Sequence, residues 1–178
     1  MRQTVKTQRK FSKVIIHTTA TRPNWMDDAR TSAKVKEIKR WHVSDNGFSD
    51  IGYHFLIDRD GTVAKGRTLD RIGAHTLGQN TGSIAIALIG GHGGTAKDIF
   101  ADNYTPEQEI SLKKLLEKIQ NEHGKYEVYG HNEFAAKACP CFSVKDWLKS
   151  FTAPVVNERS GANPRYRNCG RKFGRILT

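Results

Sequence analysis

The sequence has little cysteine and no long apolar run. Its three cysteines, Cys139, Cys141 and Cys169, are an odd number in 178 residues, and two of them lie one residue apart, which is too close to bridge each other. The chain does not need disulfides to fold, because this length lets one domain bury about two-thirds of its unfolded surface. No segment reaches the roughly 20 apolar residues of a membrane span or resembles a secretory leader. We therefore expect the chain to be made and kept in the cytoplasm, without a membrane span.

Acidic residues are also scarce relative to basic ones. The chain has 18 Asp and Glu against 29 Lys and Arg, a formal charge of +11. Such an excess favours association with polyanions, but no helix-turn-helix, zinc-finger or RNA-binding signature accompanies it. Nucleic acid, anionic envelope polymers and an acidic protein surface all remain open as partners.

The hydrophobic pattern predicts a single domain of the α/β (α+β) class, with a mixed central sheet flanked by helices. Predicted strands cover 13–17, 83–91 and 126–131, a hairpin turns at Asp60-Gly61 within 53–67, and helices cover 33–45, 106–123 and 144–151. Thr105, Pro106 and Gln108 form a capping-box start for the middle helix, and Gly124 ends it. We expect a basic arm over 1–12, a catalytic domain over 13–151 and a basic tail over 152–178.

Histidine and cysteine are residue types that bind zinc, and three of them stand at a predicted strand end or in a loop: His17, His131 and Cys139. His17 and His131 are 114 residues apart and His131 and Cys139 only eight, unlike the paired ligands of a structural zinc finger. Three protein ligands on a preformed sheet leave the fourth tetrahedral position open for water, as in catalytic sites. The residues alone leave a second interpretation open, in which the histidines are ordinary polar residues and the cysteine is a small buried side chain.

Five motifs occur in order and together resemble one enzyme family: "IIHTTAT", "DIGYHFLIDRDGTVAKGR", "GAHTLGQNTGSIAIALIGG", "YTPEQEISLKKLL" and "GHNEFAAKACPCF". They are similar to the zinc-dependent N-acetylmuramoyl-L-alanine amidases of the amidase-2 or peptidoglycan-recognition superfamily. The T-odd phage lysozyme (endolysin) type is the nearest, since its short arm and K-x-Q-R element resemble "VKTQRKFS". The resemblance covers about residues 6–150 and implies an enzyme that cuts the bond between N-acetylmuramic acid and L-alanine in peptidoglycan.

The resemblance implies a role for seven residues. His17, His131 and Cys139 correspond to the ligands of one catalytic Zn²⁺, which lowers the pKa of bound water to about 7. Tyr53 and Lys137 correspond to catalytic residues that orient water or relay a proton and that stabilise an oxyanion. His75 and Asn80 resemble positions that line the substrate groove.

Other polar residues near these motifs have structural interpretations. Strand alternation places His54 on the face opposite Tyr53, and core packing explains Trp41, which neighbours His42. Cys141 stands where the family often has a small polar residue; we assign it to packing, because Cys139 precedes the proline in "KACP".

Other functions remain open beside the endolysin. Receptors of the superfamily keep the groove without catalysis, but they typically lack the cysteine ligand. Cytosolic recycling amidases tend to have a glutamate in place of Tyr53. Phage lysozymes of this type also bind their phage RNA polymerase, so that partner is a further hypothesis. We expect a monomer that stays in the host bacterial cytoplasm until it is released to the cell wall.

Overall fold

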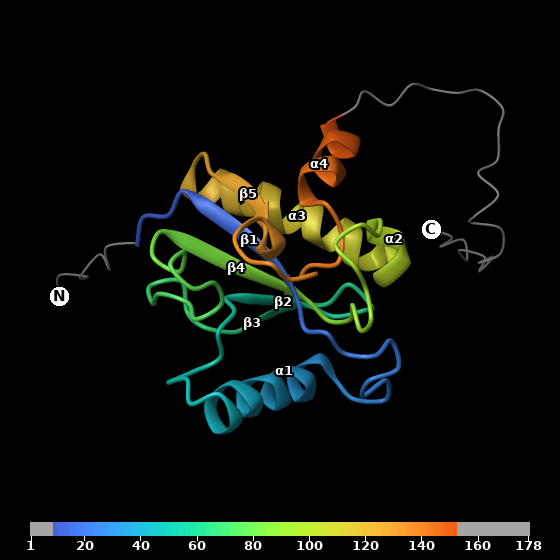
Figure 1. The fold of residues 1–178 in the computed structure, drawn as a ribbon. Helices are drawn as coiled ribbons and strands as arrows, with labels where there is room; N and C mark the ends of the chain where they lie inside the picture. The colour runs from blue at the N-terminus through green and yellow to red at the C-terminus, as the bar shows by residue number, and fades with distance from the viewer. Residues whose placement is uncertain (1–8, 153–178) are drawn as a thin grey trace, which may run out of the picture.

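The computed structural model describes residues 9–152, with side chains to 150, and a five-stranded sheet forms its centre (Figure 1). The sheet has the order β3-β2-β4-β1-β5, and β3 alone is antiparallel to its neighbour. The strands are β1 (Lys13–Thr18), β2 (Phe55–Ile57), β3 (Val63–Lys65), β4 (Ser83–Leu88) and β5 (Glu127–Gly130). The predicted mixed sheet and fold class are confirmed.

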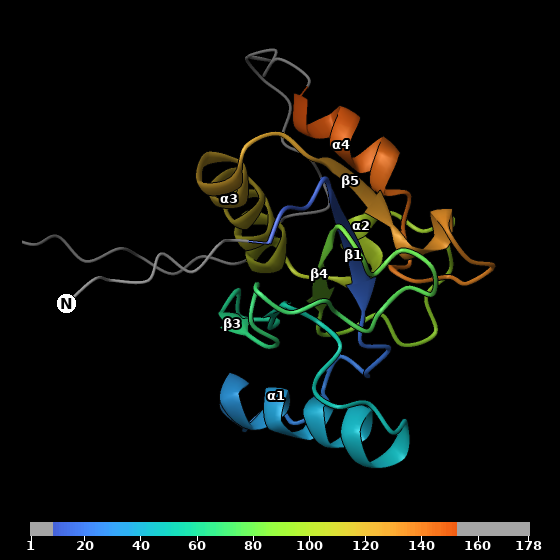
Figure 2. The same ribbon diagram turned by 90° about the vertical axis from the view of Figure 1, so that its left-hand side faces the viewer.

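Helices cover the two faces of the sheet. They are α1 (Thr31–Arg40), with a wider π-helical turn η1 (Trp41–Asp45), α2 (Phe100–Asn103), α3 (Pro106–His123), the 3₁₀ turn η2 (His131–Glu133) and α4 (Val144–Thr152). The views in Figures 1 and 2 place α1 and α3 on opposite sides of the sheet. None of the described helices is long and apolar enough to cross a membrane.

The alternation of β4 explains why the two faces differ. Ile84, Ile86 and Leu88 pack in the larger core with α3 and α4, whereas Ala87 packs with Ile38 of α1. A strand presents successive side chains to opposite faces. The small alanines of "SIAIAL" therefore face the side on which the chemistry-bearing residues gather.

Most element predictions are confirmed, with differences at the ends. Thr105 caps α3 in the predicted capping box with Gln108, and the β2–β3 hairpin turns at Gly61, whose φ is 84°. The strand predicted over 83–91 ends at Leu88, because Gly90 and Gly91 have φ of 140° and 76° and leave the extended region.

Two other predicted boundaries were wrong, and one short helix was missed. The first helix begins at Thr31, earlier than predicted. The strand predicted to end in His131 stops at Gly130, and His131 starts η2. The short helix α2 had no strong periodicity to reveal it. Most of the arm predicted over 1–12 and of the tail over 152–178, including Cys169, lies outside the described residues.

Candidate metal centre and active site

Among the described residues, His17, His131 and Cys139 bring their possible ligand atoms within 4.8 Å of one another. His17 is on β1 and is 1 % exposed, His131 follows β5 and is 9 % exposed, and Cys139 lies in the loop after η2. Cys139 Sγ is 3.7 Å from His17 Nδ1. The structure thus gathers the three residues that the sequence singled out.

Strand pairing brings the two histidines together. β1 and β5 are parallel neighbours, and Ile16 pairs with Gly130, so His17 and His131 follow paired residues. Their ring centroids lie 4.7 Å apart. Two residues 114 positions apart in the sequence therefore lie side by side, at the carboxyl ends of the central strand β1 and the edge strand β5.

Hydrogen bonds to the backbone hold the loop that carries Cys139. The Asn132 amide donates to the Cys139 carbonyl at 2.7 Å, and the buried Tyr104 hydroxyl donates to the Pro140 carbonyl at 2.7 Å. The Thr18 amide donates to Cys139 Sγ at 3.2 Å. A backbone donor at the sulfur favours the thiolate, which is the form that binds metal.

The donor set and its spacing fit zinc. Imidazole nitrogen and thiolate sulfur are both zinc donors, and tetrahedral bonds of about 2.3 Å to sulfur and 2.0–2.1 Å to nitrogen separate those atoms by about 3.6 Å. The observed sulfur–nitrogen distance is 3.7 Å. Without a cation, burial raises the pKa of Cys139 to about 12 and holds the pKa of His17 well below its usual value. Binding a metal therefore requires loss of the thiol proton.

Tyr53 and Lys137 both lie beside this cluster. The Tyr53 ring is 5.2 Å from that of His17 and 5.1 Å from that of His42, and burial raises the pKa of Tyr53, so the phenol keeps its proton. Lys137 is exposed in the Cys139 loop. Burial is the main cause of the lowered pKa of His17 and His131, and the positive charge of Lys137 adds to it; the same charge opposes the rise in the pKa of Cys139 that burial causes.

His75 and Asn80 lie in the loop between β3 and β4, on the His17 side of the cluster. His75 Nδ1 is 3.1 Å from His17 Nε2, and burial lowers the pKa of His75 to about 3, so its ring is neutral. The Asn80 side-chain oxygen accepts from the amides of His75 and Thr76, both at 2.9 Å. That oxygen therefore accepts hydrogen bonds from its own loop, and substrate contact by His75 or Asn80 stays a prediction.

Neighbouring polar residues have structural partners. His54 Nδ1 accepts from the Ala85 amide at 3.0 Å, and His42 Nδ1 accepts from the Gly52 amide at 2.9 Å. The Cys141 thiol is buried and donates to the Gly91 carbonyl at 3.4 Å. These contacts agree with the structural roles expected from the sequence.

Sequence reasoning missed Arg67, which supports the loops on the Tyr53 side. Its guanidinium is buried and donates to the carbonyls of Ile51 at 2.7 Å, Asp50 at 2.9 Å and Ile72 at 2.6 Å. Its amide also donates to the Tyr53 carbonyl at 2.8 Å. An arginine after a hairpin resembles a solvated charge in sequence, so no signal pointed to this role.

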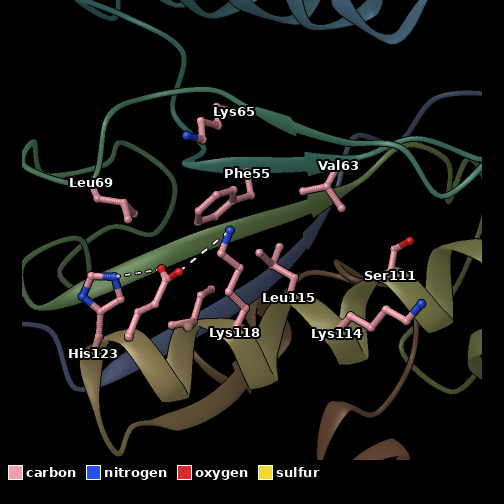
Figure 3. A pocket seen from close by; sticks show the side chains of 11 residues that line it. Phe55, Val63, Lys65, Leu69, Ser111, Lys114, Leu115, Lys118 and His123 are labelled. Carbon is pink, nitrogen blue, oxygen red and sulfur yellow. Dashed lines mark ion pairs between the residues drawn. The ribbon is translucent and has the colours of Figure 1, made fainter.

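Two surface hollows lie outside the cluster, since neither has His17, His131 or Cys139 in its lining. One of about 650 Å³ is lined by the Cys139 loop, including Lys137, and by Ser143 and Lys145. The other, about 400 Å³, lies between the β2–β3 hairpin and α3, away from the Cys139 loop. In Figure 3, Phe55 and Val63 face α3 across this groove, with lysines around it.

Comparison with known proteins identifies the family. Residues 7–142 match the family described as N-acetylmuramoyl-L-alanine amidase, Amidase_2. The endolysin of Enterobacteria phage K11 is 37 % identical over 143 residues, which are 80 % of this chain and 89 % of that protein. The endolysin of Escherichia phage T7 is 37 % identical over 142 residues, which are 80 % of this chain and 88 % of that protein.

A solved structure agrees in fold. The structure of peptidoglycan recognition protein-LE in complex with tracheal cytotoxin, a monomeric diaminopimelic acid-type peptidoglycan, aligns with a TM-score of 0.62 at 26 % identity. The alignment covers 79 % of each chain. The family match covers most of the chain and the fold agrees with it, so this chain belongs to the amidase-2 family of N-acetylmuramoyl-L-alanine amidases and is similar to phage endolysins.

Proposed function

We propose that this chain is a phage-type endolysin that hydrolyses the amide bond between N-acetylmuramic acid and L-alanine in bacterial peptidoglycan, with one Zn²⁺ held by His17, His131 and Cys139. The gathering of three ligand atoms within 4.8 Å carries the proposal. The family match and the phage endolysin relatives support the reaction.

The residues around the cluster have defined parts in this reaction. Zinc, when bound, supplies Lewis acidity and makes a water nucleophilic near neutral pH. Lys137 carries a positive charge beside the cluster, where it stabilises the oxyanion that forms from the amide carbonyl oxygen when water attacks the carbon. Tyr53 keeps its phenolic proton, so it donates a hydrogen bond that orients water or moves a proton toward the leaving amine.

Peptidoglycan is the substrate class that the relatives support. The structure of a recognition protein with a monomeric peptidoglycan fragment has the same fold. The formal charge of +11 adds long-range attraction to the anionic cell envelope, and added salt should weaken it. Intact sacculi should therefore be better substrates than soluble muropeptides, which a recycling amidase would prefer.

The test measures zinc content and release of soluble amino groups from purified sacculi. The wild type should bind one zinc and free L-alanine amino termini, and Cys139→Ala should do neither. Cys141→Ala is the matched control, because Cys141 donates to the Gly91 carbonyl and lies outside the ligand set. Wild type that binds sacculi with zinc present, yet releases no amino groups, would sink the enzymatic function and favour a recognition protein.

Three further parts of the proposal depend on other measurements. Binding to a phage RNA polymerase rests on the short likeness of the "VKTQRKFS" arm, and co-purification with a phage polymerase tests it. A monomeric state is checked by sedimentation. Residence in the host cytoplasm until release to the wall is checked by fractionating infected cells before and after lysis.

A further inference from the structure

The second ring nitrogen of His17 is occupied by another histidine. His17 Nδ1 faces the Cys139 sulfur at 3.7 Å, so Nδ1 is the nitrogen aimed at the metal position. His17 Nε2 lies 3.1 Å from His75 Nδ1. A neutral imidazole has one N–H and one acceptor nitrogen. With Nδ1 as ligand, Nε2 carries the hydrogen and donates it to His75.

The same reasoning extends this series of hydrogen bonds beyond His75. A ring that accepts at Nδ1 has its hydrogen on Nε2, and His75 Nε2 lies 3.3 Å from Ser83 Oγ. The Ser83 hydroxyl in turn donates to the Gln79 carbonyl at 2.7 Å. Every donor therefore meets an acceptor, from His17 through His75 and Ser83 to a backbone carbonyl.

The fold fixes the position of His75 firmly. Its own amide and that of Thr76 donate to the Asn80 side chain at 2.9 Å, which closes the loop around the ring. Ser83 is the first residue of β4 and is fully buried. The Thr76 hydroxyl lies beside the hydrogen bond between the two rings, 3.1 Å from His75 Nδ1 and 3.5 Å from His17 Nε2.

We propose that His75 is a positioning residue, which accepts the His17 Nε2 hydrogen and, through Ser83, fixes the tautomer and orientation of the imidazole that holds zinc. This inference rests on the proposed zinc site, and it gives His75 a task distinct from the substrate contact expected from the sequence. Partners of this kind orient a metal-binding histidine and raise its basicity, and losing one typically costs 10-fold to 100-fold in metal affinity.

Zinc affinity, measured by competition with a coloured chelator, tests the hydrogen bonds from His17 through His75 to Ser83. His75→Leu removes the acceptor, and zinc should bind about 10-fold to 100-fold more weakly. His75→Asn places an amide oxygen near the position of Nδ1, so affinity should return to within about threefold of wild type. Ser83→Ala leaves His75 in place but removes the acceptor of its Nε2 hydrogen. The loss of zinc affinity should therefore be smaller than for His75→Leu.

A neighbouring buried histidine is the matched control. His54 hydrogen-bonds to the Ala85 amide and the Arg71 carbonyl, and its ring lies 6.1 Å from that of His75 but outside the hydrogen bonds that link His17, His75 and Ser83. His54→Asn should lower the thermal stability of the zinc-free protein while leaving zinc affinity unchanged. Equal losses of affinity in His54→Asn and His75→Leu would overturn the proposal, because general loosening would then explain both.

The remaining outcomes separate this inference from the function on which it rests. Wild type that binds no zinc overturns both. Wild type that binds zinc, with His75→Leu binding it equally well, overturns the positioning role alone. A His75→Leu variant with normal zinc affinity and a raised KM on sacculi also overturns it and assigns His75 to the substrate.

Discussion

The candidate active site has two halves with different supports. The sheet half comprises His17 on β1, with Tyr53 and His75 packed beside it; the loop half comprises His131, Lys137 and Cys139. His17 is 1 % exposed on a strand paired on both sides. The loop half instead depends on single hydrogen bonds to carbonyls, such as that from Tyr104 to Pro140. A rigid sheet supplies one part of the geometry and a supported loop supplies the other.

The largest effect is expected from the exposed charge of the loop half. Lys137→Met should lower kcat on sacculi by about 10²-fold to 10³-fold, because it removes a group that stabilises the oxyanion. Lys145→Met is the control, since Lys145 lines the same hollow but is not among the charges that act on the cluster. Steady-state kinetics with zinc content measured in parallel checks this. Equal losses in the two variants would mean that overall charge, and not position, matters.

Removing the hydroxyl of Tyr53, in the sheet half, should lower activity without loss of zinc. Tyr53→Phe keeps the ring contacts with His17 and His42 but lacks the hydroxyl. We expect kcat to fall about 10²-fold, which is the low end for loss of a proton-transfer group. Zinc content and unfolding midpoint should stay at wild-type values. An unchanged kcat would remove Tyr53 from the catalytic residues.

The support beneath Tyr53 is expected to affect stability most. Arg67→Met leaves three carbonyls of the neighbouring loops without their buried donor, and the free energy of unfolding should fall by about 3 kcal/mol. Arg71→Met is the matched control, because Arg71 pairs with Asp50 at the surface and is 48 % exposed. That variant should change stability by less than about 0.5 kcal/mol. Urea unfolding measures both, and similar losses would contradict the role of Arg67.

The sequence predicted the loop half of the site better than its supports. The motif around Cys139 and the strands predicted to end in His17 and His131 indicated the three residues that gather in the cluster, and periodicity predicted the sheet and α3. What the sequence did not reveal depends on tertiary contacts: Arg67 reads as a surface charge, and Ser83 as an ordinary first residue of a strand. Hydrogen bonds between loops far apart in sequence have no periodicity, so these partners emerge only once the chain is folded.

The buried histidine His54 should make the sheet side sensitive to acid. Burial lowers the pKa of His54 to about 4, whereas the unfolded chain titrates near 6.5. Between these pH values the unfolded state binds more protons, so the stability contributed by neutral His54 is lost as the pH falls from about 6.5 toward 4. Urea unfolding of zinc-free protein checks this: the stability difference between wild type and His54→Asn should narrow by about 2–3 kcal/mol over that range. A difference independent of pH would contradict it.

The smallest effect is expected where one hydroxyl supports the loop half. Tyr104→Phe removes the donor to the Pro140 carbonyl at 2.7 Å, and the free energy of unfolding should fall by about 1 kcal/mol. Tyr129→Phe is the matched control, because its hydroxyl donates to Glu127 at the surface and its loss should be nearly neutral. If the loop half depends on such single bonds, Tyr104→Phe should also weaken zinc binding measurably, while Arg67→Met should not. Zinc affinity unchanged in Tyr104→Phe would mean that the strand end at His131 and the Thr18 amide suffice to hold Cys139, and the two halves would then share one support.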